Sequence, residues 1–139
     1  MLGTLQLLTG RRLKPGHQPK SILIVDDSDS VRFAVRTAIE TCTNFRVCGE
    51  ATHGSEAVTI AQELQPDLVI MDVAMPMMNG VEAASLLKKK IPGLPIVLFT
   101  LYADEMNAPL SSFGVTVILS KTDGFIPLLN CLNGLLGSD

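Results

Sequence analysis

The sequence predicts an α/β domain of (βα)5 type, in which a doubly wound, five-stranded parallel sheet is covered by helices on both faces. Five short apolar runs alternate with five stretches whose apolar residues recur at helical spacing. Strands and helices that alternate in this way form a parallel sheet with right-handed crossovers. The 139 residues make one domain with a full hydrophobic core, and they contain no internal repeat.

The first half of the chain supplies two strands and two helices. The apolar run at 22–25 ends in polar residues that can cap a helix over 31–42, whose apolar side chains recur at i, i+3, i+4 and i+7. A second strand, expected near an edge of the sheet, occupies 45–51. The next helix begins at Gly54 and is ended by Pro66. The side chains expected to face the core from these two helices are Val31, Ala34, Val35, Ala38, Ile39, Cys42, Ala57, Val58, Ala61 and Leu64.

The strand at 67–72 is the most informative part of the sequence, because four apolar residues run directly into Asp72. An unpaired charge is too costly in the interior, so we expect Asp72 at the carboxyl edge of the sheet, where open α/β folds place their ligands. Pro76 prevents the strand from continuing, and Gly80 lets the chain turn into a helix that ends in three lysines at 88–90.

The last part of the chain completes the alternation. A strand at 94–100 delivers Thr100 to its end, and a helix is expected over 103–113, although Pro109 interrupts it. A strand at 115–121 then ends at Lys121, and a helix follows over 124–138.

Composition and charge exclude several classes of protein. With 47% hydrophobic and 18% charged residues, the chain is not disordered throughout. The net charge is −3, and residues 1–19 contain basic residues but no acid, so the domain at 20–139 is more acidic than the whole chain. Such a domain is not expected to bind nucleic acid. No apolar run reaches the ~18 residues of a membrane span, so no membrane association is expected.

Residues 1–19 contain two prolines, three glycines and a basic cluster, and we expect a flexible leader whose origin, natural or from cloning, stays open. The leader lacks a charged segment before its apolar patch, which argues against a signal peptide. The three cysteines are odd in number and lack metal-ligand spacing, so we expect buried free thiols in the reducing cytoplasm.

Ionisable and hydroxyl side chains follow four of the five predicted strands, and the carboxyl ends of parallel strands share one edge. Three carboxylates would therefore crowd together, and at ~5 Å with an effective dielectric constant of ~20 each pair repels by roughly 3 kcal/mol. A lysine and a divalent cation can offset this repulsion, and all-oxygen ligation points to Mg²⁺ or Mn²⁺. Such a site can position a phosphoryl group for attack by a carboxylate. The residues concerned are Asp26, Asp27, Asp72, Thr100 and Lys121.

On these residues the chain from about 20 to 136 resembles a response-regulator receiver domain of two-component signalling. Any one of the matching motifs is weak, but four of them in order on a (βα)5 pattern are specific. The resemblance implies a flavodoxin-like sheet with the strand order 2-1-3-4-5. The motifs are the pair Asp26-Asp27, Asp72 followed by Met-Pro and Gly80, Thr100, and Lys121.

The resemblance also implies roles for the acidic residues. Asp72 would accept the phosphoryl group from a phosphohistidine of a sensor histidine kinase or phosphotransfer protein. Asp27 would bind Mg²⁺ directly and Asp26 through water, while the backbone carbonyl of Ala74 would complete the protein ligands.

For the remaining site residues, the resemblance implies that Thr100 swings toward the phosphoryl group and that Lys121 pairs with it. The signal would then leave through a change in the surface formed by 103–113, 115–121 and 124–138.

The sequence departs from the family pattern at several positions. Ile118 stands where the family usually has Tyr or Phe, so the usual aromatic readout of phosphorylation is not expected, and Tyr102 is the single tyrosine that could replace it. Leu101 follows the switch Thr in place of a small residue and could restrict access to the acyl phosphate. Lys121 is followed by Thr122, as in receivers that precede some helix-turn-helix output domains. The chain is either a stand-alone receiver or part of a longer regulator.

The predicted last helix is unusual because residues 124–138 carry no charge. A helix on a small α/β domain normally keeps a polar outer face. If Leu128, Leu135 or their neighbours are exposed, this helix would form a homodimer or output interface. If they are buried, Asn, Gly and Ser form the outer face.

Two other functions remain open on the sequence alone. The segment 27–31 fits a signature that resembles haloacid-dehalogenase-type phosphatases, with Asp27 as nucleophile and Asp29 as acid/base, but this reading gives Asp72 no nucleophilic role. The second alternative is a receiver-like interaction module that no longer uses phosphate, which Ile118 and Leu101 favour and the complete set of acids and lysine opposes.

Overall fold

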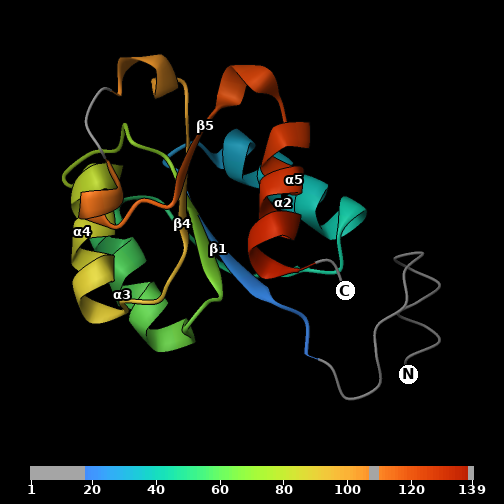
Figure 1. The fold of residues 1–139 in the computed structure, drawn as a ribbon, viewed down its shortest axis with the longest axis horizontal. Helices are drawn as coiled ribbons and strands as arrows, with labels where there is room; N and C mark the ends of the chain where they lie inside the picture. Colours follow the sequence, from blue (N-terminus) through green and yellow to red (C-terminus); the bar gives the residue numbers. More distant parts are fainter. Residues whose placement is uncertain (1–17, 107–109, 138–139) are drawn as a thin grey trace.

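The computed structural model describes residues 18–106 and 110–137, and in it five strands form one parallel sheet with the order β2-β1-β3-β4-β5 (Figure 1). The predicted fold class and strand order are confirmed, and the second strand lies at an edge as expected. The strands are β1 (Ser21–Val25), β2 (Arg46–Ala51), β3 (Leu68–Met71), β4 (Ile96–Thr100) and β5 (Val117–Ser120).

Helices cover both faces of the sheet, with α2 and α5 on one face and α3 and α4 on the other (Figure 1). Alternate residues of β1 pack against these two layers: Ile22 and Ile24 belong to the core with α2 and α5, whereas Leu23 and Val25 belong to the core with α3 and α4. Because both faces are covered, β1, β3 and β4 are buried along their whole length. The helices are α2 (Asp29–Cys42), α3 (Gly54–Leu64), α4 (Gly80–Lys90) and α5 (Ile126–Leu136).

The expected helix over 103–113 is wrong for the residues that the structure describes there. Two short 3-10 helices, η1 (Ala103–Glu105) and η2 (Leu110–Phe113), stand in its place, and Pro109 lies outside the described residues. The described side chains of 103–106 and 111–113 are exposed or only partly buried. These described residues therefore form no apolar stripe whose packing on the sheet would stabilise an α-helix. A third 3-10 helix, η3 (Lys121–Asp123), follows β5 directly.

Two side chains expected to face the core are instead exposed. Leu64 is 46% exposed at the last residue of α3, and Cys42 is exposed at the last residue of α2. Both lie where a helix leaves the sheet, so helical spacing alone overstates how far burial extends. Cys48 and Cys131 are partly buried, and within the described part of the chain no cysteine forms a disulfide. The expectation of buried thiols is therefore wrong for Cys42.

Most of the predicted leader, residues 1–17, lies outside the described residues, so the leader and the domain boundary at residue 20 remain predictions. Among the helices of 18–106 and 110–137, none is both long and apolar enough to cross a membrane.

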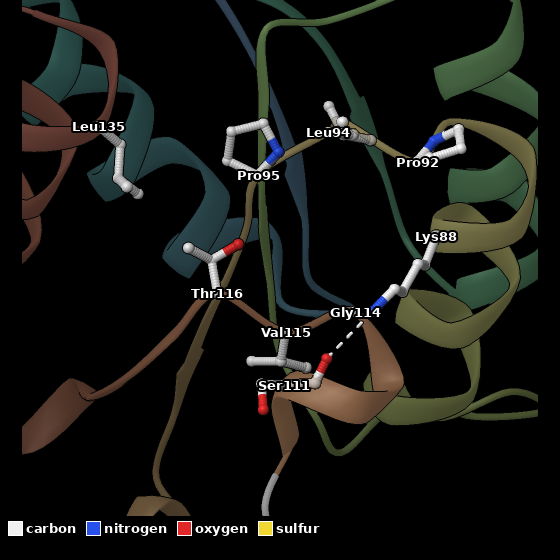
Figure 2. A pocket seen from close by; sticks show the side chains of 10 residues that line it. Lys88, Pro92, Leu94, Pro95, Ser111, Gly114, Val115, Thr116 and Leu135 are labelled. Atoms are coloured by element: carbon white, nitrogen blue, oxygen red, sulfur yellow. Dashed lines mark hydrogen bonds between the residues drawn. The ribbon is translucent and has the colours of Figure 1, made fainter.

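A cavity of about 330 Å³ opens at the amino edge of the sheet, beside the starts of β4 and β5 (Figure 2). Lys88 of α4 reaches across it, and its Nζ donates a hydrogen bond to the backbone carbonyl of Ser111 at 3.3 Å. Apolar and small residues form the rest of its lining, and none of the candidate site residues is among them. The predicted acidic residues Asp26 and Asp72 instead follow the carboxyl ends of β1 and β3, at the opposite edge of the sheet.

Candidate functional site

The acidic residues reach the carboxyl edge of the sheet on two adjacent strands, β1 and β3. The register pairs Val25 with Met71, so the residues that follow, Asp26 and Asp72, leave the sheet side by side. The backbone continues the ladder for one more step, because Asp72 N–H donates to the Val25 carbonyl and Asp26 N–H donates to the Ala51 carbonyl, both at 3.0 Å. The two carboxylates are therefore placed by the sheet itself.

Three carboxylates converge at this edge, as the sequence predicts. Oxygen atoms of Asp26, Asp27 and Asp72 all lie within 4.8 Å of one another. Asp26 and Asp72 are buried, at 3% and 6% exposure, while Asp27 is exposed and opens the cluster to solvent. Hard oxygen donors at this spacing fit a divalent cation such as Mg²⁺ better than a soft metal.

Lys121 supplies the positive charge inside the cluster. Its Nζ donates to Asp26 Oδ2 at 2.7 Å and to Asp72 Oδ2 at 3.2 Å, from the first residue of η3. Burial is the largest single influence on this amine and lowers its pKa. The hydrogen bond and charge of Asp26, followed by those of Asp72, outweigh burial, and the pKa of Lys121 is raised above its ordinary value. The amine of Lys121 therefore stays protonated and positively charged at neutral pH.

The backbone of the loop that follows β3 holds the side chain of Asp72 in place. Asp72 Oδ1 accepts a hydrogen bond from Val73 N–H at 2.7 Å. Gly80 N–H donates to the Val73 carbonyl at 3.0 Å, so the loop from Val73 to Gly80 folds back onto the strand end. A Cβ at Gly80 would lie 2.1 Å from the Asp72 carbonyl oxygen, so only glycine fits where α4 begins. Ala74 is exposed in this loop, two residues beyond Asp72.

Thr100 ends β4 and is fully buried. Its Oγ1 accepts a hydrogen bond from Tyr102 N–H at 3.2 Å, which ties the hydroxyl to the turn that follows. Leu101 and Tyr102 project outward, at 61% and 49% exposure. Ile118 is partly buried and packs against the core on the α3 and α4 side. Leu101 and Tyr102, which directly follow Thr100, are therefore largely exposed. Ile118 instead pairs with Leu98 of β4 and packs against the core.

Arg32 is a further residue at this edge that the sequence analysis did not identify. Its Nη1 donates to the Asp26 carbonyl at 2.6 Å and its Nε to Glu50 Oε1 at 2.8 Å. The sequence does indicate one contact of Arg32, because Asp29 and Arg32 stand at i and i+3 near the start of a predicted helix. These two residues form an ion pair in the structure. That spacing gives no sign of the contact to the Asp26 backbone.

Comparison with known proteins identifies the family. The model of the response regulator receiver domain matches residues 22–130, which includes both acidic strand ends, Thr100 and Lys121. The chain belongs to the response-regulator receiver family. This receiver family generally serves signalling rather than catalysis, so the membership favours a signalling role over the phosphatase alternative.

Relatives of this receiver occur within longer proteins. The response regulator protein VraR of Staphylococcus saprophyticus is 38% identical over 106 residues, which are 75% of this chain and 50% of that protein. A protein-glutamate methylesterase/protein-glutamine glutaminase of Pyrococcus abyssi is 37% identical over 98 residues, 70% of this chain and 24% of that protein. The chain thus spans about half the length of VraR and less of the methylesterase.

The fold agrees with solved receivers. The crystal structure of the response regulator domain of Thermotoga maritima CheB matches with a TM-score of 0.77 and 29% identity, covering 88% of this chain and 99% of that domain. The likeness therefore extends over nearly the whole of a receiver domain.

Proposed function

We propose that this receiver accepts a phosphoryl group on Asp72 from the phosphohistidine of a sensor histidine kinase or a phosphotransfer protein, in a reaction that requires Mg²⁺ or Mn²⁺. The observation that carries this proposal is the position of the Asp72 carboxylate, which shares a 4.8 Å cluster with two other aspartates and lies 3.2 Å from the Lys121 amine. Receiver family membership supports the same assignment.

In the proposed transfer, a carboxylate oxygen of Asp72 attacks phosphorus, and the P–O bond forms as the P–N bond of the phosphohistidine breaks. The electron pair of that bond stays on the imidazole nitrogen, and the product is an aspartyl phosphate. Lys121 donates hydrogen bonds to the phosphoryl oxygens, for which its amine has to leave Asp72 Oδ2. The Thr100 hydroxyl then turns toward the phosphoryl group and gives up its bond from Tyr102 N–H.

The cation would be held by the carboxylates of Asp27 and Asp72 and the carbonyl of Ala74, with Asp26 acting through a water molecule. Mg²⁺, when bound, neutralises charge on the phosphoryl oxygens and on the crowded acids. The exposure of Asp27 fits this arrangement, because Mg²⁺ keeps several water ligands and needs an open side.

The output of the proposed switch is a change in the surface made by η1, η2, β5 and α5. Movement of Thr100 releases the turn at Tyr102, which leads directly into η1. The family usually has Tyr or Phe on β5, and this aromatic ring rotates inward with the switch Thr. Because Ile118 stands at that position here, the turn at Tyr102 transmits the signal instead. We place the protein in the cytoplasm, where sensor kinases present their phosphohistidines.

The test is incubation with acetyl phosphate or phosphoramidate and Mg²⁺, followed by mass spectrometry to locate the added phosphoryl group. We expect one phosphoryl group, on Asp72, and none when EDTA removes the cation. A label on Asp27 would instead indicate the phosphatase chemistry. A chain that never takes a label, and whose melting temperature does not rise with beryllofluoride and Mg²⁺, would be an interaction module.

We also propose that α5 mediates homodimerisation. Ile126 is 73% exposed and Leu135 is 37% exposed, whereas Leu128 is buried in the core. Since residues 124–138 carry no charge, two copies of α5 can meet without like-charge repulsion. We expect a concentration-dependent dimer in analytical ultracentrifugation that Ile126→Ser weakens. A strict monomer at high concentration, with and without phosphodonor, would contradict this proposal.

A further inference from the structure

Arg32 lies behind the pair of acids at the end of β1 and connects three separate elements. Its Nη1 donates to the Asp26 carbonyl at 2.6 Å, its Nε donates to Glu50 Oε1 of β2 at 2.8 Å, and its Nη2 contacts Asp29 Oδ1 in the first turn of α2. The side chain is only 11% exposed. The planar guanidinium offers donors in fixed directions, so these contacts define its orientation.

The contact with the Asp26 carbonyl acts on Asp27. The peptide group between the two residues is planar, so the direction of the Asp26 carbonyl sets the direction in which Asp27 leaves the strand. The other side of Asp26 is held by its N–H, which donates to the Ala51 carbonyl at 3.0 Å. Asp27 itself is exposed, so the backbone before it, rather than packing, aims its carboxylate.

Glu50 binds the Nε side of the Arg32 guanidinium. Its two oxygens divide between two arginines, because Oε1 accepts from Arg32 Nε and Oε2 from Arg36 Nε, both at 2.8 Å. Burial, the largest influence, raises the pKa of Glu50, but the hydrogen bonds from Arg36 and Arg32 outweigh it and hold that pKa below its ordinary value. Glu50 is therefore an ionised acceptor at neutral pH, on a strand that pairs with β1.

We propose that Arg32 is a positioning residue for the cation site, which holds the Asp26–Asp27 peptide so that the Asp27 carboxylate faces Asp26 and Asp72. The inference rests on the proposed function only in taking these three acids as the cation site. Arg32 acts on the cluster through the backbone carbonyl of Asp26, to which its Nη1 donates. Such outer contacts typically change metal affinity by about 10-fold to 100-fold.

Charge and geometry predict opposite effects of removing Arg32. If the guanidinium acted only through its charge, its loss would leave Glu50 and Asp29 less compensated, and Mg²⁺ would bind more tightly. If it positions Asp27, its loss lets the peptide rotate, and Mg²⁺ binds more weakly. The direction of the change therefore separates the two roles.

The test measures Mg²⁺ affinity by isothermal titration calorimetry, without any phosphodonor. We expect Arg32→Met to weaken Mg²⁺ binding about 10-fold. Arg32→Lys should weaken it as well, because one ammonium group retains the charge but cannot hold both the Asp26 carbonyl and Glu50 in the same geometry. Arg36→Met is the matched control, since it removes the other arginine of Glu50 and leaves the Asp26 carbonyl in contact with Arg32. We expect it to change the affinity less than 2-fold.

Urea unfolding in EDTA measures the folded fraction of each variant. The Mg²⁺ affinities are then compared only between chains that have the same folded fraction. Unchanged or tighter Mg²⁺ binding in Arg32→Met, or an equal loss in Arg36→Met, would overturn the positioning role, as would a wild-type chain that binds no Mg²⁺. A wild-type chain that binds Mg²⁺ but takes no label on Asp72 would contradict the proposed function and leave the comparison of Arg32 with Arg36 valid.

Discussion

Asp72→Asn is expected to abolish uptake of the phosphoryl group from acetyl phosphate, because an amide cannot serve as the attacking nucleophile. The substitution preserves size and removes one of three crowded charges, so the fold should be kept. We expect Lys121 to keep its hydrogen bond to Asp26, which is 2.7 Å long in the wild-type chain. The measurement is the phosphorylated fraction by intact mass over time, with the wild-type chain run in parallel.

The control for this variant is Asp104→Asn, which makes the same chemical change on an exposed residue of η1. It should label at the wild-type rate. If a folded Asp72→Asn chain still takes up the label at the wild-type rate and at the position that is labelled in the wild-type chain, Asp72 is not the acceptor. Circular dichroism establishes that the variant is folded.

Gly80→Ala is expected to lower the free energy of unfolding by about 3 kcal/mol or more, at the upper end of overpacking effects. The added Cβ would lie 2.1 Å from the Asp72 carbonyl oxygen and 3.0 Å from Val73 Cα, and both of these are backbone atoms that cannot turn aside. The loop must move, so labelling of Asp72 should slow as well. Urea unfolding measures the first effect, as a lower midpoint, and the labelling rate at matched folded fraction measures the second.

The same substitution has the opposite expected sign at Gly134, in the interior of α5. A Cβ there would meet nothing within 4 Å, and alanine is favoured over glycine in a helix by about 0.5–1 kcal/mol. Gly134→Ala should therefore raise the unfolding midpoint and leave labelling unchanged. If both variants behave alike, the close approach at Gly80 does not constrain the site.

The sequence predicts most of this site because most of its residues lie at the carboxyl ends of strands or directly after them. The apolar runs that end at Val25 and Met71 place the acids at the sheet edge, and parallel pairing brings Lys121 to them from the far end of the chain. Periodicity was less informative where packing on the sheet ends, as Leu64 and Cys42 show.

The parts that could not be predicted depend on contacts without a fixed spacing in the sequence. Arg32 reaches a backbone carbonyl, and any residue has such a group, so no motif marks the interaction. The segment 103–113 was expected to be helical by its place in the alternation of elements, but its described side chains do not pack as a stripe.

Lys121 directly follows β5, which pairs with β4 at an edge of the sheet formed by the described residues. All residues of β5 are only partly buried. The acids stand on β1 and β3, which are fully buried in the interior of the sheet. Segments with few buried apolar contacts open locally at a smaller free-energy cost than the global unfolding of a domain. Local opening of β5 would move the Lys121 amine away from Asp26 and Asp72 while the two carboxylates stay in place. We therefore expect the acid cluster to bind a divalent cation most tightly when β5 is open.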